Sequence, residues 1–352
     1  MKKFAFFAAL AAVLLLVGCG LESGKKDSEN KKVSIVATIY PQYDWLKNVL
    51  GDRLGAVDLK LLIKNGTDLH SYKPSAQDIA SIASSDMVVY VGGESDEWIK
   101  KALEATPKAG RVQLNLMQAL GDRVKEEEVV EGMQAEEEHE HGEEHAEEHH
   151  HEHGEEHAEE HHHEHGEEHA EEAENDEHIW LSLKNAEILV NALAESLAKV
   201  DAANASTYKA NASAYVAKLQ ELDGNFAAAI SGAEGKTVLF GDRFPFRYLV
   251  DDYGIKYYAA FVGCSAESEA SFETVAFLAG KMDSLSLPAI FKIDGSNGKI
   301  AQAILEASKK SKNAQVLTLN SMQSVTDEQI KSGMDYLSMM LSNLEVLKKA
   351  IK

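Results

Sequence analysis

The chain has 352 residues, of which 44% are hydrophobic and 26% are charged, and its formal net charge is −23. This length is enough for a large core and for about two domains of ~150 residues each. Positions 126–178 hold 25 Asp and Glu residues and no Lys or Arg, so the rest of the chain, with 33 acidic and 35 basic residues, is nearly neutral. The absence of a basic domain argues against nucleic-acid binding. Because the chain has only two cysteines, Cys19 and Cys264, a disulfide framework and a Cys-cluster zinc fold are excluded.

The N-terminus has the pattern of a targeting segment. Two lysines are followed by an apolar run at positions 4–17, which is shorter than the ~20 residues that a membrane span needs. The run ends in Leu-Val-Gly-Cys19, which resembles the bacterial lipobox, in which the cysteine becomes the acylated N-terminus; an ordinary signal peptide with a chance cysteine is the alternative. We therefore expect a lipoprotein signal peptide at 1–18, lipidation of Cys19 and a flexible tether at 19–32, which is rich in Ser, Lys, Asp and Asn.

Alternating strands and helices are predicted after the tether. Short β-branched and apolar runs bounded by Gly, Pro or Asn are typical of buried strands, and helical spacing separates them. The expected strands are 33–39, 57–63 and 87–91, and the expected helices are 42–50, 75–84 and 98–105. This alternation predicts a parallel sheet that is covered by helices on both faces.

An acidic insert interrupts this pattern at 126–177. The 12-residue unit HEHGEEHAEEHH occurs twice from His139 onward, and a third copy then degrades. No apolar residue larger than Ala occurs at 134–177, so we expect the insert to be disordered without a ligand. Its imidazoles predict capture of metal ions, and the alternative is a solvated acidic spacer. The insert holds His139, His141, His145, His149, His150, His151, His153, His157, His161, His162, His163, His165 and His169.

Two helices and a second α/β set are predicted after the insert. Positions 181–228 have helical periodicity without proline, with a break near 201–206. The expected strands are 237–240, 257–261, 289–293 and 315–319, and the expected helices are 246–253, 272–285, 298–308 and 326–351. The fold class is therefore α/β, with two β/α lobes of mostly parallel sheets joined by a long helix. We assign 33–185 to the N-terminal lobe, 186–232 to connecting helices and 233–352 to the C-terminal lobe.

Two histidines, His70 and His178, lie outside the insert. His70 follows a predicted strand, and His178 directly precedes a predicted helix. Ligands of open α/β sheets bind at the carboxyl ends of the strands, so these two imidazoles are candidates to bind one metal ion together. A capping or surface histidine is the alternative for each of them.

The motifs around both histidines resemble those of a known family. The segment GTDLHSYKPSAQD at 66–78 is similar to the Gly-x-Asp-Pro-His-x-Tyr-Glu-Pro signature of metal-binding periplasmic solute-binding proteins, the receptors of zinc and manganese ABC importers. The segment DEHIWLSLKNA at 176–186 looks like the Asp-Pro-His-x-Trp-x-Asp-Pro-x-Asn-Ala motif of the same family, and 336–350 resembles its last helix. The likeness covers 33–352, and a His-rich insert is itself a feature of the zinc-importing members.

The resemblance implies a rigid helix between the lobes and a metal site with one ligand from each of four loops. His70 and His178 match the family motifs directly, and Asp294 at the end of a late strand fits a carboxylate ligand, with a turn cap as the alternative. Arg243 stands where the family has His or Glu, and a guanidinium cannot act as a ligand. The neighbouring Asp242 is therefore the predicted third ligand. The competing residues on the next loop are Cys264, Glu267 and Glu269.

Two imidazoles and two carboxylates suit Zn²⁺, and they suit Mn²⁺ or Fe²⁺ if a carboxylate binds through both oxygens. The insert favours Zn²⁺. The resemblance thus implies a monomeric, lipid-anchored, extracytoplasmic receptor that delivers Zn²⁺ to an ABC permease. The alternatives are a Mn²⁺ or Fe²⁺ receptor and a metal-sequestering or adhesive surface lipoprotein. We do not expect an enzyme, because the chain has no His-Glu-x-x-His, Gly-x-Ser-x-Gly or phosphate-binding loop.

Overall fold

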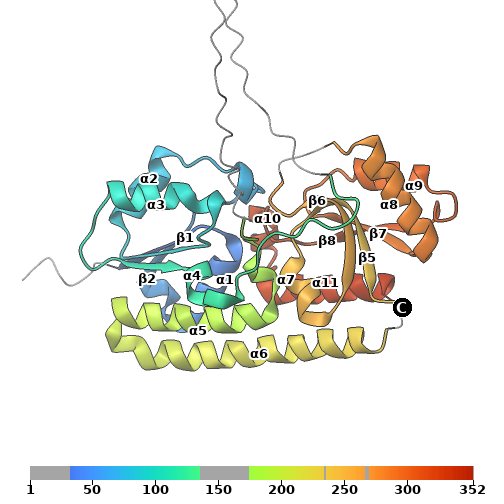
Figure 1. The fold of residues 1–352 in the computed structure, drawn as a ribbon. Helices are drawn as coiled ribbons and strands as arrows, with labels where there is room; N and C mark the ends of the chain where they lie inside the picture. The colour runs from blue at the N-terminus through green and yellow to red at the C-terminus, as the bar shows by residue number, and fades with distance from the viewer. Residues whose placement is uncertain (1–31, 135–173, 234, 266–268, 352) are drawn as a thin grey trace, which may run out of the picture. The chain divides into compact units, whose positions relative to one another are not determined.

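The structure is a computed structural model that describes residues 32–134, 174–233, 235–265 and 269–351 (Figure 1). The predicted signal peptide, nearly all of the tether, and the thirteen histidines of the insert lie outside the described residues. Cys19 and Glu267 also lie outside them. Within the described part, no helix is long and apolar enough to cross a membrane.

The N-terminal lobe is a parallel sheet of four strands in the order β2-β1-β3-β4 (Figure 1). The strands are β1 (Val33–Ala37), β2 (Val57–Leu61), β3 (Met87–Tyr90) and β4 (Val112–Asn115), and the helices are α1 (Tyr40–Leu50), α2 (Ala76–Ser84), α3 (Glu97–Ala105) and α4 (Leu116–Leu120). The sequence did not predict β4 and α4, because the first is a partly exposed edge strand of four residues and the second has five residues.

The C-terminal lobe repeats this arrangement, with strand order β6-β5-β7-β8 and all pairs parallel. The strands are β5 (Thr237–Phe244), β6 (Lys256–Val262), β7 (Ala289–Ile293) and β8 (Gln315–Leu319), and the helices are α7 (Arg247–Tyr253), α8 (Phe272–Leu285), α9 (Lys299–Ala307), α10 (Asp327–Lys331) and α11 (Tyr336–Ala350). β5 runs four residues beyond its predicted end, through a register shift between Phe240 and Arg243. The predicted helix at 326–351 is two helices, since Gly333 has a positive φ and Asp335 caps α11.

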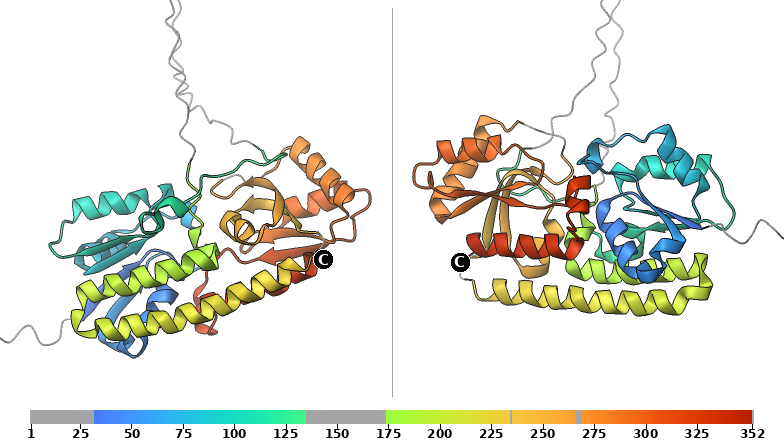
Figure 2. Two further views of the ribbon diagram at one scale, coloured as in Figure 1. Left: turned by 60° about the horizontal axis from the view of Figure 1, so that its bottom comes forward. Right: turned by 180° about the vertical axis from the view of Figure 1, so that it is seen from behind.

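Two helices connect the lobes. α5 (Leu183–Val200) and α6 (Ala205–Ser231) pack side by side. In Figure 1, α5 lies below the N-terminal lobe and α6 runs below both lobes, and Figure 2 shows the same pairing from two other directions. α6 has 27 residues, so it is about 40 Å long. It contacts α1 of the N-terminal lobe and α7 and α11 of the C-terminal lobe. The prediction of two parallel α/β lobes joined by a long helix is therefore confirmed.

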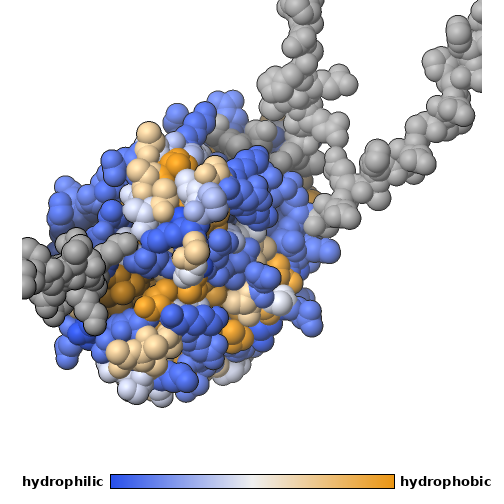
Figure 3. Space-filling model, turned by 90° about the vertical axis from the view of Figure 1, so that its left-hand side faces the viewer, coloured by the Kyte–Doolittle hydropathy of each residue, from blue (hydrophilic) through white to orange (hydrophobic). Residues whose placement is uncertain are grey.

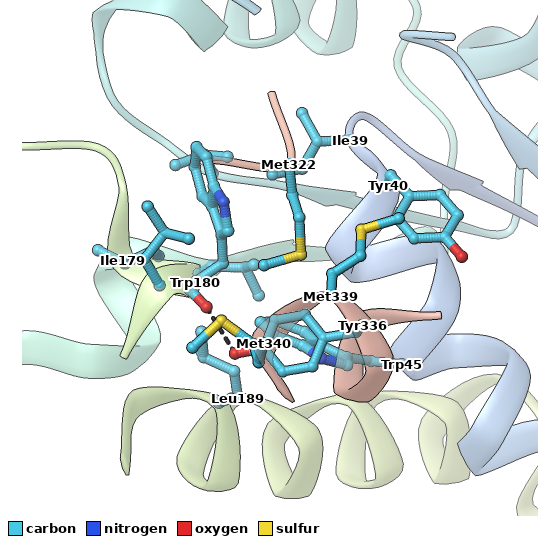
Figure 4. Packing of buried hydrophobic residues seen from close by; sticks show 14 of the residues in the cluster. Ile39, Tyr40, Trp45, Ile179, Trp180, Leu189, Met322, Tyr336, Met339 and Met340 are labelled. Atoms are coloured by element: carbon cyan, nitrogen blue, oxygen red, sulfur yellow. Dashed lines mark hydrogen bonds between the residues drawn. The ribbon is translucent and has the colours of Figure 1, made fainter. Parts of the chain in front are cut away.

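A shared hydrophobic core also joins the lobes, because one cluster of buried residues contains side chains from both sheets. Figure 4 shows its centre, where Trp45 of α1 packs edge to face on Tyr336 of α11 at a ring distance of 5.1 Å. The Tyr336 hydroxyl donates a 2.7 Å hydrogen bond to the carbonyl of Trp180, two residues after His178. Relative movement of the lobes would have to disrupt this packing, so the core favours a fixed interlobe geometry.

The protein surface is mainly polar on the face shown in Figure 3. Hydrophilic residues cover most of this face, and apolar residues lie between them. The large apolar side chains are instead concentrated in the core described above.

Candidate metal centre

His70 lies in the short turn η2 (Leu69–Ser71), beyond the carboxyl end of β2. Asp68 caps this turn by accepting a hydrogen bond from the His70 backbone N–H at 3.0 Å. The Nδ1 atom of His70 lies 2.7 Å from Ser95 Oγ, on the loop after β3. These contacts fix the ring and leave its Nε2 pointing away from its own loop.

His178 is fully buried, directly before the turn η5 (Ile179–Leu181). Asp176 Oδ1 lies 2.8 Å from the His178 backbone nitrogen and 3.0 Å from its Nδ1. A carboxylate on Nδ1 favours the tautomer whose Nε2 carries a free lone pair, the arrangement typical of metal-binding histidines. The ring is also packed edge to face on Trp180 at 5.3 Å.

The two Nε2 atoms converge, 3.1 Å apart. The side-chain nitrogen of Gln323, on the loop after β8, lies 2.9 Å from Nε2 of His70 and 2.5 Å from Nε2 of His178. An amide NH₂ group has two hydrogens, so it can donate one to each imidazole. Burial, and then repulsion from His178 and Arg243, lowers the pKa of His70 to about 2, which keeps its ring neutral. The Nε2 atoms of both imidazoles are thus aimed at one point.

Cys264 completes a group of three potential metal ligands. One ligand atom each of His70, His178 and Cys264 lies within 4.8 Å of the others. Cys264 follows β6, and Glu127 Oε1 accepts a hydrogen bond from its backbone N–H at 2.9 Å. The preceding Gly263 permits the close approach, because a Cβ atom there would lie 2.9 Å from the Phe244 carbonyl oxygen and 3.0 Å from His178 Cε1. Burial, and then the charge of Glu127, raises the pKa of the Cys264 thiol.

Arg243 lies near the end of β5, and a neighbouring carboxylate balances its positive charge. Its guanidinium pairs with Asp68, the residue that caps the turn of His70. It also donates a 3.4 Å hydrogen bond to the carbonyl of Ser265. Arg243 therefore links the loops that carry His70 and Cys264.

Asp242 and Asp294 lie outside the group of three ligands formed by the histidines and Cys264. Asp242 accepts hydrogen bonds from the backbone N–H groups of Arg243 and Ile293, at 3.0 and 3.4 Å. Asp294 accepts bonds of 2.5 and 2.7 Å from the backbone and hydroxyl of Ser321, and burial raises its pKa. Both line a 470 Å³ cavity that His70 also borders. That either carboxylate binds the metal stays a prediction; the competitor Glu269 is exposed.

A second cavity, of 330 Å³, borders His70 and Cys264 from another side. Carboxylates dominate its wall, which suits a cation. One of them, Glu177, is buried, and one of its oxygens has no hydrogen-bond partner in the described part of the chain. The polar residues of this wall are Glu94, Ser95, Glu127, Glu174, Asn175 and Glu177.

Gln323 and Glu127 contact the candidate ligands of this centre, although the sequence does not predict either of them there. Gln323 lies 145 positions after His178, and glutamine has no metal-binding signature, so spacing alone gave no signal. Glu127 was counted as part of the acidic insert. The only available sign was its place at the start of that insert, before the repeats begin.

Comparison with known proteins gives a consistent assignment. Residues 35–350 match the family described as ZnuA, zinc-uptake complex component A, periplasmic. The zinc-binding lipoprotein AdcA of Streptococcus pneumoniae R6 is 33% identical over 352 residues, which are 99% of this chain and 61% of that protein. The high-affinity zinc uptake system protein ZnuA of Bacillus subtilis 168 is 30% identical over 353 residues, covering 99% of this chain and 98% of that protein. The chain therefore spans about three fifths of the AdcA relatives and nearly all of the Bacillus one.

Solved structures agree with the fold. The Zn(II)-bound ZnuA-like domain of Streptococcus pneumoniae AdcA has a TM-score of 0.65 and 28% identity, covering 91% of this chain and 99% of that one. The Zn(II)-bound full AdcA gives a TM-score of 0.66 at 28% identity, with 91% of this chain and 58% of that one covered. The expected likeness to metal-binding solute-binding proteins is confirmed.

Proposed function

Because this chain belongs to the family of the periplasmic zinc-uptake component A, we propose that it is the extracytoplasmic receptor of a zinc ABC importer. The receptor captures Zn²⁺ between its two lobes and passes it to a membrane permease. The observation that carries this proposal is the pair of imidazole nitrogens, His70 Nε2 and His178 Nε2, which converge 3.1 Å apart between the lobes. The family is one of solute-binding receptors, and its members are not enzymes.

The donor set fits zinc. In a tetrahedral zinc site with Zn–N bonds of about 2.0–2.1 Å, two nitrogen ligands are roughly 3.3 Å apart. The observed separation of His70 Nε2 and His178 Nε2 is close to this value. Both rings have a partner on Nδ1, as metal-binding histidines usually do.

The location of the protein follows from the same proposal. Cys19 carries the acyl chains, the mature protein is a monomer anchored to the outer face of a bacterial cell membrane, and residues 20–32 tether it. The thirteen histidines of the insert bind further Zn²⁺ ions more weakly than the interlobe site, because they come from a stretch with no apolar residue larger than Ala to pack around a site.

Metal competition on the purified protein tests the receptor proposal. We expect one tight Zn²⁺ equivalent, binding of Mn²⁺ that is weaker by orders of magnitude, and Zn²⁺-dependent stimulation of ATP hydrolysis by the permease in proteoliposomes. His70→Ala or His178→Ala should each weaken the tight equivalent at least about 100-fold, since even outer-shell partners contribute roughly 10–100-fold to metal affinity. The matched control is His169→Ala in the insert. Tight binding that survives in both site variants, or preference for Mn²⁺, contradicts the proposal.

A further inference from the structure

We propose that Cys264 is the third protein ligand of the interlobe zinc ion, joining His70 and His178 in a His₂Cys set. This inference rests on the proposed function and specifies how this chain performs it. It replaces the predicted ligand Asp242 with a thiolate from the loop after β6.

The geometry of the three residues supports this ligand set. Tetrahedral zinc with a Zn–S bond of about 2.3 Å and Zn–N bonds of about 2.0–2.1 Å separates sulfur from nitrogen by roughly 3.6 Å. Ligand atoms of His70, His178 and Cys264 lie within 4.8 Å of one another, so small side-chain rotations bring all three into bonding range. Among the residues that the structure describes, these three form the one such group of His, Cys, Asp and Glu ligands.

The backbone around Cys264 holds it at this place. Its N–H is hydrogen-bonded to Glu127, and Gly263 lets the turn lie against the His178 ring. Arg243 bonds to the carbonyl of the next residue, Ser265. The backbone at Cys264 is therefore held by contacts from both lobes.

The neighbouring strand end does not offer an equivalent ligand. Arg243 is a permanent cation and is paired with Asp68. Asp242 uses its two oxygens on backbone N–H groups of Arg243 and Ile293, and those bonds hold it at the strand end. Asp242 is not in the group of ligand atoms that lie within 4.8 Å of one another, whereas Cys264 is.

Binding of Zn²⁺ then exchanges the thiol proton of Cys264 for the metal ion. The S–H bond of Cys264 breaks, a Zn–S bond forms, and one proton is released to the buffer for each Zn²⁺ bound. A thiolate and two imidazoles prefer Zn²⁺ to the harder Mn²⁺, so Cys264 also determines metal selectivity. The remaining positive charge of the bound ion faces the carboxylate of Glu127.

Spectroscopy on the full chain carrying Cys19→Ser tests the assignment, because Cys264 is then the only thiol. One equivalent of Co²⁺ should produce a sulfur-to-cobalt charge-transfer band, and one equivalent of Zn²⁺ should show a sulfur neighbour at about 2.3 Å in X-ray absorption. Histidines of the insert cannot generate either signal. A tight equivalent without the sulfur signals overturns the Cys264 assignment and leaves the receptor function standing, whereas the absence of any tight equivalent refutes the receptor function itself.

Two matched variants give an independent readout. Cys264→Ser should weaken the first Zn²⁺ equivalent at least about 100-fold, because a direct ligand contributes no less than the roughly 10–100-fold of an outer-shell group. Asp242→Asn removes a charge from the adjacent strand end and should change affinity less than about threefold, or roughly 0.7 kcal/mol. The reverse ranking of the two variants, with folding confirmed by circular dichroism, identifies Asp242 as the third ligand instead.

Discussion

Gln323 lies between the two site histidines and satisfies both of their lone pairs with one amide group. The residue before it, Met322, is buried and has a positive φ of 60°, a backbone conformation that is costly for a non-glycine residue. Asp294 holds this loop through Ser321. The amide of Gln323 therefore links the two imidazoles to the loop after β8.

Replacing the Gln323 amide by a carboxylate should raise the affinity for Zn²⁺ and lower the stability of the metal-free protein. In Gln323→Glu we expect Zn²⁺ affinity to rise by about tenfold, or 1.4 kcal/mol, because an anion then faces the metal position. The metal-free protein should lose about 1–3 kcal/mol, since the buried carboxylate has no hydrogen to donate to the imidazoles. Chelator competition and denaturant unfolding measure the two quantities. Gln323→Met, which has similar length and no charge, is the control and should not gain affinity; unchanged metal-free stability of Gln323→Glu would show that the amide contacts contribute nothing.

Asp96 predicts a pH dependence of stability. The side chain is fully buried and accepts a 2.5 Å hydrogen bond from the backbone of Val91. Burial, and then the nearby charge of Glu177, raises its pKa to about 7. The unfolded residue releases its proton near pH 3.9, so between about pH 4 and 7 the folded state binds more protons than the unfolded one. The free energy of unfolding should therefore fall as the pH rises through this window, by up to about 1.4 kcal/mol per pH unit from this group.

Urea unfolding of the metal-free protein from pH 4.5 to 7 measures this slope. Asp96→Asn has no titrating group at this position, so its unfolding free energy should fall less steeply with pH than that of the parent protein. Asp122→Asn changes an exposed carboxylate in the same lobe and should leave the slope unchanged. Parallel profiles for the parent and Asp96→Asn would show that the Asp96 carboxyl is not protonated in the folded state.

At the scale of elements, α11 connects the last part of the chain to the first helix and to the candidate metal centre. Tyr336 begins this helix, donates from its backbone to Asp44 of α1 at 3.2 Å, and bonds through its hydroxyl to the Trp180 carbonyl. Trp180 in turn packs on His178. The first residue of α11 thus holds in place the segment that carries His178.

Tyr336→Phe should destabilise the protein by about 1–3 kcal/mol, because the buried carbonyl of Trp180 loses its hydrogen bond while the ring stays in place. Chemical denaturation measures the difference. Tyr43→Phe, which removes the hydroxyl of a half-buried tyrosine of α1, is the control, and we expect a change within about 0.5 kcal/mol. Equal stability of Tyr336→Phe and the parent would mean that water replaces the lost hydroxyl.

The sequence predicted most elements to within a few residues, because hydrophobic period and Gly or Pro boundaries mark them. The strands 289–293 and 315–319 and the helix 272–285 agree with β7, β8 and α8 at both ends. The two candidate histidines could also be predicted from the sequence, since each lies in a motif at a strand end or helix start. The remaining contacts depend on tertiary structure: Gln323 and Cys264 approach the histidines because the carboxyl ends of β6 and β8 face the same point as that of β2. No local sequence pattern predicts that these residues lie close together.

At the scale of the whole molecule, the insert leaves and rejoins the core at one place. Glu126 forms an antiparallel bridge with Asn175, the Glu127 N–H donates to the Glu174 carbonyl at 2.7 Å, and the Asp176 N–H donates to the Lys125 carbonyl at 2.8 Å. The outgoing chain then continues over the C-terminal lobe, where Gln134 bonds to the backbone of β6. The returning segment leads within a few residues to His178.

This arrangement makes the insert separable from the tight site. In a variant whose residues 135–173 are replaced by a flexible Gly/Ser linker, the paired segments at 125–127 and 174–176 are retained, and so are His70, His178 and Cys264. We expect the tight Zn²⁺ equivalent to keep its affinity within about threefold, or 0.7 kcal/mol, while the weaker equivalents disappear with the thirteen histidines. Chelator competition measures the first quantity, and metal content at saturating Zn²⁺ measures the second. A matched insert with every histidine changed to Gln, which keeps length and acidity, should behave like the deletion. Loss of the tight equivalent in both variants would mean that an insert histidine is a ligand of the interlobe zinc, because the two variants share only the loss of imidazole.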